Sequence, residues 1–343
     1  MATINPKLEF YRFKLNPRQE GFKTFRDFAI EELSGKKSFD NDKIMKLLFA
    51  YFIKSLDGKY SKDDKMKKQI KLEKRKSINL YLNNQPTFSP KDNIIFGVIN
   101  GGSYGRDRII GDVDNPEEGS QLGKNKTVLQ YYFFFLYLPL DHDEGCFIIH
   151  SNGKEETITN IFRSYISNIF KASNYNKVNV ESFCPKSFQD EFKKGATIKT
   201  IEFKDSKVDN IHTPNGTSDI IGQYDIKIEL TPKNKDISIG NFAKVKSTFA
   251  NFIFGREKEH KKLHDFDEAK VLAKNPVDNS VRTFEWSTKD QDFVPVVYLD
   301  GRIKKYNGDG TPNFDELETL CKNYFKDEVL PEIRPDLNVT KAK

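Results

Sequence analysis

The segment Tyr131–Leu140, with the sequence YYFFFLYLPL, is the most apolar run of this chain. Ten residues do not suffice to cross a bilayer as a helix, which needs about 20. A second apolar stretch, Cys146–His150, follows the polar link Asp141–Gly145. We therefore expect Val128–Leu138 and Cys146–His150 to form a buried β-hairpin.

The sequence before this hairpin predicts strands and one amphipathic helix. Apolar and charged residues alternate over Leu8–Phe13, which is typical of a strand. Asn41-Asp42 offers a helix N-cap, apolar residues follow at helical spacing as far as Phe52, and Gly58 provides a stop. Further strands are expected at 77–82, 93–99 and 108–113.

The sequence after the hairpin continues the mixture of strands and helices. Ile158–Phe170 carries one apolar stripe and predicts a helix. Asp300-Gly301 predicts a type I′ turn within a hairpin. A last helix is expected from Asn313 to Pro331. Strands are also expected at 197–203 and 221–230, a helix at 242–252, and the hairpin over 293–306.

Strands outnumber helices in this prediction and do not alternate with them regularly. This pattern favours an α+β fold, with mainly antiparallel sheets and packed amphipathic helices. A chain of 343 residues usually forms more than one core. We expect two domains, residues 1–177 and 178–343, with a polar boundary between them.

Composition narrows the class of protein. The 29 Phe and 14 Tyr residues supply apolar area to a polar chain. The three cysteines are far apart and form no CxxC pair, so we expect reduced thiols and neither a zinc site nor a disulfide framework. The N-terminus lacks the apolar core of a signal peptide, which indicates a cytoplasmic protein. No motif requires a cofactor or a metal.

Positive charge is concentrated in one tract, Lys59–Lys76. Its nine basic and three acidic residues give a net charge of +6, which equals that of the whole chain. We expect an exposed helix or arm that contacts phosphate groups, because concentrated positive charge suits a polyanion. Tyr60 and Tyr81 could stack on unpaired bases. The expected phosphate contacts are Lys62, Lys65, Lys67, Lys68, Lys71, Lys74, Arg75 and Lys76. The alternative is a solvated charged segment without a ligand.

Asn100–Arg108, NGGSYGRDR, is a second candidate phosphate site. Glycines allow close approach of the backbone to a phosphate, and Arg106 and Arg108 could pair with it. The segment is not a Walker motif, because no Gly-Lys-Ser/Thr follows. A hairpin loop without a ligand is the favoured alternative.

Three other segments imitate metal or acid–base sites. Asn307–Glu316 resembles a calcium loop, but Lys305 occupies the first ligand position, so a turn followed by a helix cap is expected. His260 and His264 have metal-ligand spacing in a charged segment. Asp141–Glu144 is a carboxylate-rich link for which a polar turn is favoured over a role in catalysis.

Acidic residues near predicted strands leave a Mg²⁺-dependent nuclease as an alternative. Asp219, Asp225 and Lys227 could hold the metal and orient water, as could Asp190 with Glu202 and Lys204. Such triplets arise easily in a chain with 31% charged residues. Cys184 and the five histidines show no spacing typical of a nucleophilic triad.

Several segments resemble the RexA family of phage-exclusion proteins. The resemblance is carried by Ser77–Leu80 with Leu82-Asn83, by Val178–Glu181 leading into Lys194–Lys204, and by the stretch Phe242–Phe254. It covers less than half of the chain and does not extend to the residues of the basic tract. The resemblance implies a two-domain α+β dimer that binds DNA with little sequence preference and acts with a separate effector, in some cases a membrane protein.

The sequence favours a non-catalytic, largely sequence-independent DNA-binding protein, the sensor component of a bacterial anti-phage system. Two alternatives stay open. One is a protein-interaction subunit, in which aromatic strands and Phe-rich helices seat a partner. The other is the nuclease described above.

Overall fold

The computed structural model describes the larger part of the chain and shows two compact units. Unit 1 comprises Met1–Phe183 and Val297–Lys343, and unit 2 comprises Cys184–Val296. Residues 297–343 thus return to the first unit, whereas the sequence suggested one domain from residue 178 to the end. The described residues are 6–115, 117–152, 157–183, 185–186, 197–205, 210–211, 220–221, 226–233, 237–238, 268–274, 281–286, 293–294, 297–299 and 301–339.

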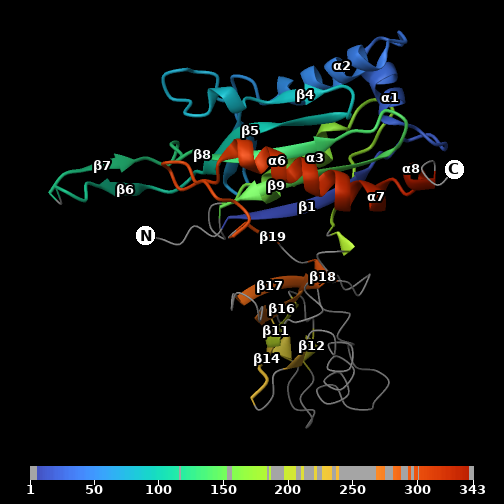
Figure 1. Cartoon of the computed structure of the whole chain (residues 1–343). Coiled ribbons are helices and arrows are strands. Elements are labelled where there is room, and N and C mark those ends of the chain that lie inside the picture. The colour runs from blue at the N-terminus through green and yellow to red at the C-terminus, as the bar shows by residue number, and fades with distance from the viewer. Residues whose placement is uncertain are drawn as a thin grey trace, which may run out of the picture. The chain divides into compact units, whose positions relative to one another are not determined.

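Unit 1 contains an antiparallel sheet that has nine strands among the described residues (Figure 1). Its main order is β10-β1-β9-β8-β5-β3-β2, while β19 pairs with β1 and β4 pairs with β5. The strands are β1 (Lys7–Lys14), β2 (Ser61–Asp63), β3 (Lys68–Lys71), β4 (Thr87–Ser89), β5 (Ile94–Ser103), β8 (Gln130–Tyr137), β9 (Glu144–Ser151), β10 (Val180–Ser182) and β19 (Val297–Tyr298). The predicted α+β class is therefore confirmed.

The apolar run forms the predicted hairpin, with β8 and β9 near the middle of the sheet. Phe134 lies opposite Ile149, and Tyr137 opposite Cys146. Successive side chains of a strand point to opposite faces. Phe134 accordingly packs on Phe162 on one face, and Phe135 packs on Phe325 on the other. Both faces of β8 are covered, which explains why the run contains no polar alternation.

Helical segments of unit 1 supply the two covering layers (Figure 1). Phe52 from α2 and Phe162 from α3 pack on Phe134, whereas Phe325 follows α6 and packs on Tyr137. The helical elements are α1 (Phe25–Phe28), η1 (Ala29–Leu33), α2 (Asn41–Lys54), η2 (Leu82–Asn84), α3 (Thr159–Ile169), α6 (Phe314–Tyr324), η5 (Phe325–Val329), α7 (Leu330–Ile333) and α8 (Asp336–Val339).

Local capping fixes where the predicted helices begin. The Asp40 carboxylate accepts the Lys43 backbone N–H at the start of α2, and the Asn313 side chain accepts the Glu316 N–H at the start of α6. The apolar stripe of α3 is buried, with Phe162 fully so. The helices expected from Asn41, Ile158 and Asn313 are confirmed, and strand 93–99 is found as β5.

Two sequence-based expectations were wrong. Residues 77–82 do not form a strand; they are turns leading into η2, and the Asn79 side chain donates to the Glu73 carbonyl. The Gly301 turn exists, with a φ of +71°, but β19 before it pairs with β1 and does not form a hairpin. The predicted helix at 242–252 lies outside the described residues.

Unit 2 contains an antiparallel sheet of six strands among its described residues, ordered β14-β11-β16-β17-β18 with β15 on β11. Its buried side chains include Ile198, Ile201, Val271 and Ala273. The strands are β11 (Thr197–Asp205), β14 (Ile226–Leu230), β15 (Ile237–Ser238), β16 (Glu268–Lys274), β17 (Val281–Trp286) and β18 (Phe293–Val294); β12 (Asn210–Ile211) pairs with β13 (Ile220–Ile221).

A separate two-stranded sheet projects from unit 1 (Figure 1). It consists of β6 (Arg108–Gly111) and β7 (Gly119–Leu122), and it includes the strand expected at 108–113. We call residues 106–126 the arm. Among the described residues, no helix of either unit has the length and apolar character needed to span a membrane.

Replacement of Phe134 by alanine should lower the free energy of unfolding by about 3–5 kcal/mol, because it opens a cavity between Phe52 and Phe162. Urea unfolding followed by circular dichroism measures this loss. Phe22→Ala is the matched control, since Phe22 is 63% exposed and should change stability little. Equal losses in both variants would contradict the assignment of β8 to the core.

Candidate nucleic-acid interface

The basic tract folds as a β-hairpin, which corrects the expected helix or arm. β2 and β3 pair antiparallel, with Lys62 opposite Gln69. The Asp63 carboxylate accepts the backbone N–H groups of Lys65 and Met66, and so closes the turn. Lys67 completes the turn with a φ of +52°. The tract is extended because Ile70 enters the core of unit 1 and β3 requires a strand partner.

This hairpin brings the two predicted phosphate sites together. β3 pairs with the end of β5, where Lys68 lies opposite Ser103 and Gln69 opposite Gly102. The Tyr104 backbone N–H donates to the Lys67 carbonyl oxygen over 2.9 Å. The segment containing Arg106 therefore begins beside the turn of the tract. Sequence analysis proposed both segments but had no signal that they are neighbours.

Part of the tract's positive charge is neutralised by the protein's own carboxylates. Glu73 is 4% exposed, and its Oε2 lies 2.6 Å from Lys71 Nζ and 2.7 Å from an Arg75 nitrogen. Lys74 Nζ lies 2.6 Å from an Asp57 oxygen. Hydrogen bonds, first from Arg75 and then from Lys71, hold the pKa of Glu73 well below its ordinary value. These three cations hold the sheet edge together.

Lys68 also has a structural partner. Its side chain is half-buried and its Nζ donates to the Thr157 carbonyl oxygen, next to α3. Burial lowers the pKa of Lys68, because desolvation disfavours the ammonium form. Lys68 is thus not positioned as a free phosphate contact.

The remaining predicted cations of the tract are exposed. Lys62, Lys65, Lys67 and Lys76 have no carboxylate within ion-pair distance in the part of the chain that the structure describes. Lys62 and Lys67 lie over the Tyr104 ring, each Nζ 5.8 Å from its centroid. This arrangement places both ammonium groups against one aromatic ring, beside β2 at the edge of the sheet.

Tyr104 is held in place by the acidic residues of the same turn. Its hydroxyl donates to an Asp64 oxygen over 2.7 Å. Desolvation, followed by this hydrogen bond, raises the pKa of Tyr104 to about 12, so the ring stays neutral. Tyr104 therefore orients Lys62 and Lys67, a role that sequence analysis did not assign to it.

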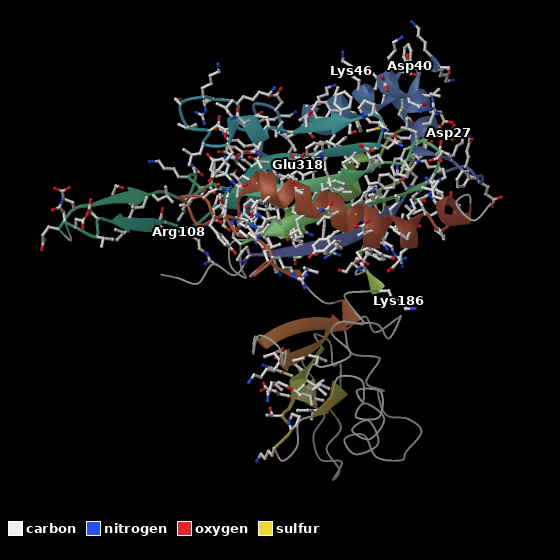
Figure 2. The ribbon with its side chains drawn as sticks, in the orientation of Figure 1. Asp27, Asp40, Lys46, Arg108, Lys186 and Glu318 are labelled. Carbon is white, nitrogen blue, oxygen red and sulfur yellow. The ribbon has the colours of Figure 1, made fainter. Side chains whose placement is uncertain are left out.

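The base of the arm adds further exposed cations. Arg106 and Arg108 are exposed, and Figure 2 shows Arg108 on the part of the arm nearest the sheet. Lys124 pairs with Asp107 at 3.7 Å, whereas Lys126 is exposed at the other strand of the arm. We call the exposed cations of the β2–β3 turn region and of the base of the arm the basic root; Lys76, which is also exposed, lies beyond the end of β3 and is not part of it. Its members are Lys62, Lys65, Lys67, Arg106, Arg108 and Lys126.

The glycines of the second candidate serve packing. Gly101 and Gly102 lie within β5. A Cβ on Gly102 would stand 2.1 Å from the Val128 carbonyl oxygen, and one on Gly101 would stand 2.5 Å from an Ile158 methyl group. The favoured alternative of a hairpin loop with left-handed residues holds only for the end of the segment. Gly101 and Gly102 are in the strand, and Gly105, with a φ of +90°, lies in the bend that follows it.

The two tyrosines considered for base stacking are engaged elsewhere. Tyr81 contacts Tyr131 and Phe314 edge-on, with centroid distances of 4.6 and 4.7 Å. Tyr60 lies under Lys71, whose Nζ is 5.0 Å from its ring centroid. The aromatic strand of the protein-interaction alternative is also inside the fold, because Phe133 and Phe135 are buried.

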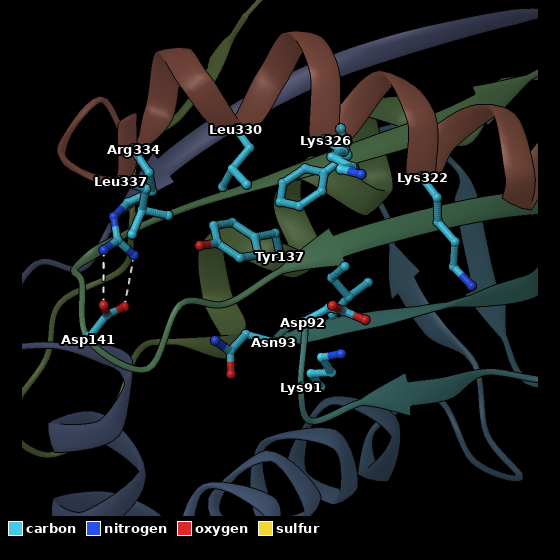
Figure 3. A pocket seen from close by; sticks show the side chains of 12 residues that line it. Lys91, Asp92, Asn93, Tyr137, Asp141, Lys322, Lys326, Leu330, Arg334 and Leu337 are labelled. Carbon is cyan, nitrogen blue, oxygen red and sulfur yellow. Dashed lines mark hydrogen bonds and ion pairs between the residues drawn. The ribbon is translucent and has the colours of Figure 1, made fainter. Parts of the chain in front are cut away.

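A pocket of about 500 Å³ lies between η5–α7 and the start of β5 (Figure 3). Tyr137 and Leu330 form part of its wall. At one end Arg334 makes two bonds to Asp141, of 2.8 and 2.9 Å, and also binds Asp336. The carboxylate of Asp141 thus fastens the C-terminal segment to the β8–β9 link.

The segments that resemble metal sites in sequence have structural roles where their residues are described. Asp309 accepts the Thr311 N–H, and Glu316 accepts the N–H groups of Lys304 and Lys305, so this segment is the predicted turn and helix cap. Lys227 is bound by Glu202 at 2.8 Å and Glu229 at 3.3 Å. Among the described residues no group of three or more His, Cys, Asp and Glu side chains is arranged to hold a metal. Cys184, Asp190, Asp219, Asp225, His260 and His264 lie outside the described residues.

Comparison with known proteins adds no relative. No family model, no curated protein and no solved structure matches this chain.

Replacement of Gly102 by alanine should lower the free energy of unfolding by about 1–3 kcal/mol, because its Cβ would collide with backbone at residue 128. Thermal unfolding measures the effect. Gly123→Ala is the matched control, because a Cβ there meets no atom within 4 Å. A stable Gly102→Ala protein would show that residue 128 can move away from β5.

Glu73→Gln should cost about 2 kcal/mol at neutral pH, because Lys71 and Arg75 lose their charged partner. The native pKa of Glu73 is lowered, so its stabilisation is complete above its ordinary value of 4.5 and is lost as the pH falls towards the native pKa. The difference between wild type and variant should therefore narrow below pH 4.5. Urea unfolding across pH measures it, with the exposed Glu117→Gln as the control. A difference independent of pH would contradict this role.

Proposed function

We propose that this chain is a non-catalytic DNA-binding protein whose basic root contacts the phosphate backbone. One observation carries the proposal. Exposed cations from two segments distant in sequence gather at one sheet edge, around Tyr104, and are not paired with carboxylates among the described residues. Of the predicted phosphate contacts in the basic tract, the proposal keeps those whose side chains are exposed and not bound within the protein.

The chemistry of the basic root favours backbone contacts over the reading of base sequence. Lysine ammonium groups are hydrated point charges, and the two arginines can each bind a phosphate through two N–H groups. Among the described residues, Tyr104 is the aromatic side chain next to these cations, and its hydroxyl and ring are engaged by Asp64, Lys62 and Lys67, so it is not a platform for bases. Affinity is therefore expected to depend on salt and little on sequence.

The resemblance to the RexA family supports a biological setting for this activity. We propose that the protein acts in the cytoplasm as the sensor of a bacterial anti-phage system, with a separate effector protein. Lys71, Lys74, Arg75 and Lys68 are assigned a structural role in this proposal, because each is bound within the protein.

The triple variant Lys62→Gln, Lys65→Gln, Lys67→Gln should bind duplex DNA more weakly than wild type. Each lost phosphate contact should make the plot of log affinity against log salt shallower by about 0.9. Fluorescence anisotropy with a labelled duplex, measured over a series of salt concentrations, tests both effects. A second, unrelated duplex of equal length should give the same affinities.

A matched control removes the same charge elsewhere on unit 1. Lys37, Lys46 and Lys171 are exposed and lie outside the basic root. Their triple Gln variant should keep both the affinity and the salt slope of wild type. Equal weakening in both triple variants would show that only net charge matters, and an unchanged affinity in the first would remove the basic root as the DNA site. Adding Mg²⁺ to the same samples and checking the duplex for cleavage tests the nuclease alternative.

A further inference from the structure

The arm is a two-stranded ribbon with open edges and exposed apolar side chains. β6 and β7 form a sheet of their own among the described residues, so each has one edge free of strand partners there. Ile109, Ile110 and Val113 are 84%, 49% and 95% exposed. An isolated two-stranded hairpin is marginally stable in water, so the arm would be stabilised by pairing with further strands.

Charge along the arm is divided between its two ends. The acidic tip, which we define as Asp112, Asp114, Glu117 and Glu118, lies at the far end, and the basic root lies at the near end. Asp112 shapes the turn by accepting the backbone N–H groups of Asp114 and Asn115. The acidic tip has no cation within ion-pair distance in the described part of the chain. The strands between the ends separate the two charges by roughly 13 Å.

We propose that two copies of this chain pair their arms antiparallel, with the acidic tip of each copy against Arg106, Arg108 and Lys126 of the other. Antiparallel alignment about a two-fold axis brings opposite charges together at both ends at once. It also supplies backbone hydrogen bonds to the open strand edges. Ile109 and Ile110 lie in the middle of β6 on opposite faces of the ribbon, and each gains a cross-strand neighbour.

The shape of unit 1 permits this pairing. The arm extends away from the sheet, so two paired arms would place the two sheets at opposite ends of a four-stranded ribbon (Figure 1). DNA is a poor alternative occupant of the whole arm, because the carboxylates of the tip would repel phosphate. The pairing engages Arg106, Arg108 and Lys126, the cations of the basic root that belong to the arm, and leaves Lys62, Lys65 and Lys67 of the basic tract to contact DNA.

Two charge-reversal variants test the pairing. The tip variant is Asp114→Lys, Glu117→Lys, Glu118→Lys, and it keeps Asp112 because Asp112 holds the turn. The root variant is Arg106→Glu, Arg108→Glu, Lys126→Glu. Sedimentation equilibrium of the full chain should show wild type as a dimer that dissociates as salt rises, and each variant alone as a monomer. An equimolar mixture of the two variants should restore the dimer, because each charge then meets its opposite.

The control variant, Glu20→Lys, Asp42→Lys, Asp327→Lys, reverses three exposed acidic residues outside the arm and should remain dimeric. Circular dichroism establishes that each variant is folded. A monomeric wild type, dimeric variants, or a mixture that stays monomeric would each overturn the proposal. The tip variant should still bind DNA, so loss of pairing and loss of DNA binding are measured separately.

Discussion

Burial of strand β8 on both faces is the constraint from which the architecture of unit 1 follows. Phe134 needs cover from Phe52 and Phe162 on one face, and Tyr137 needs cover from Phe325 on the other. No single neighbouring segment can supply both layers. The chain provides one layer from α2, far before the β8–β9 hairpin in sequence, and from α3, soon after it, and the other layer from the helical segment near its C-terminus.

Burial in the core of unit 1 also determines the conformation of the basic tract. Ile70 draws the tract into the sheet, and the charges that accompany it must then be paired or exposed. Glu73 takes Lys71 and Arg75 into a buried ion-pair network, while the turn at Asp63 turns Lys65 and Lys67 outwards. The cations of the basic tract therefore fall into two groups. Lys71 and Arg75 are paired within the fold, and Lys65 and Lys67 are exposed.

The sequence predicted secondary structure best in segments where a single pattern of apolar or capping residues was present. The apolar run over β8, the stripe of α3 and the Asn313 cap were unambiguous, since burial and capping depend on local residues. The prediction of secondary structure failed where a hydrogen bond to a residue outside the segment determined the conformation. Ser77–Leu82 has strand-like composition, but Asn79 binds the Glu73 carbonyl and the segment turns instead.

The candidate site could be predicted only in part for the same reason. Charge density pointed to Lys62–Lys67 and to Arg106 with Arg108, but pairing of β3 with β5 is what makes them neighbours. Tyr104 is held beside Lys62 and Lys67 by its hydrogen bond to Asp64, which is forty residues away in the chain. No pattern in the sequence around Tyr104 predicts this contact. Which lysines are neutralised was likewise invisible before the partners of Glu73 were known.

The return of residues 297–343 to unit 1 has a consequence for synthesis on the ribosome. When Phe183 emerges, the face of the sheet that carries Phe135 and Tyr137 still lacks Phe325. All of unit 2 must be translated before that face can close. The nascent chain thus carries an open aromatic surface until Phe325 has been made, and a chain terminated before that point would expose a patch of the kind that chaperones bind.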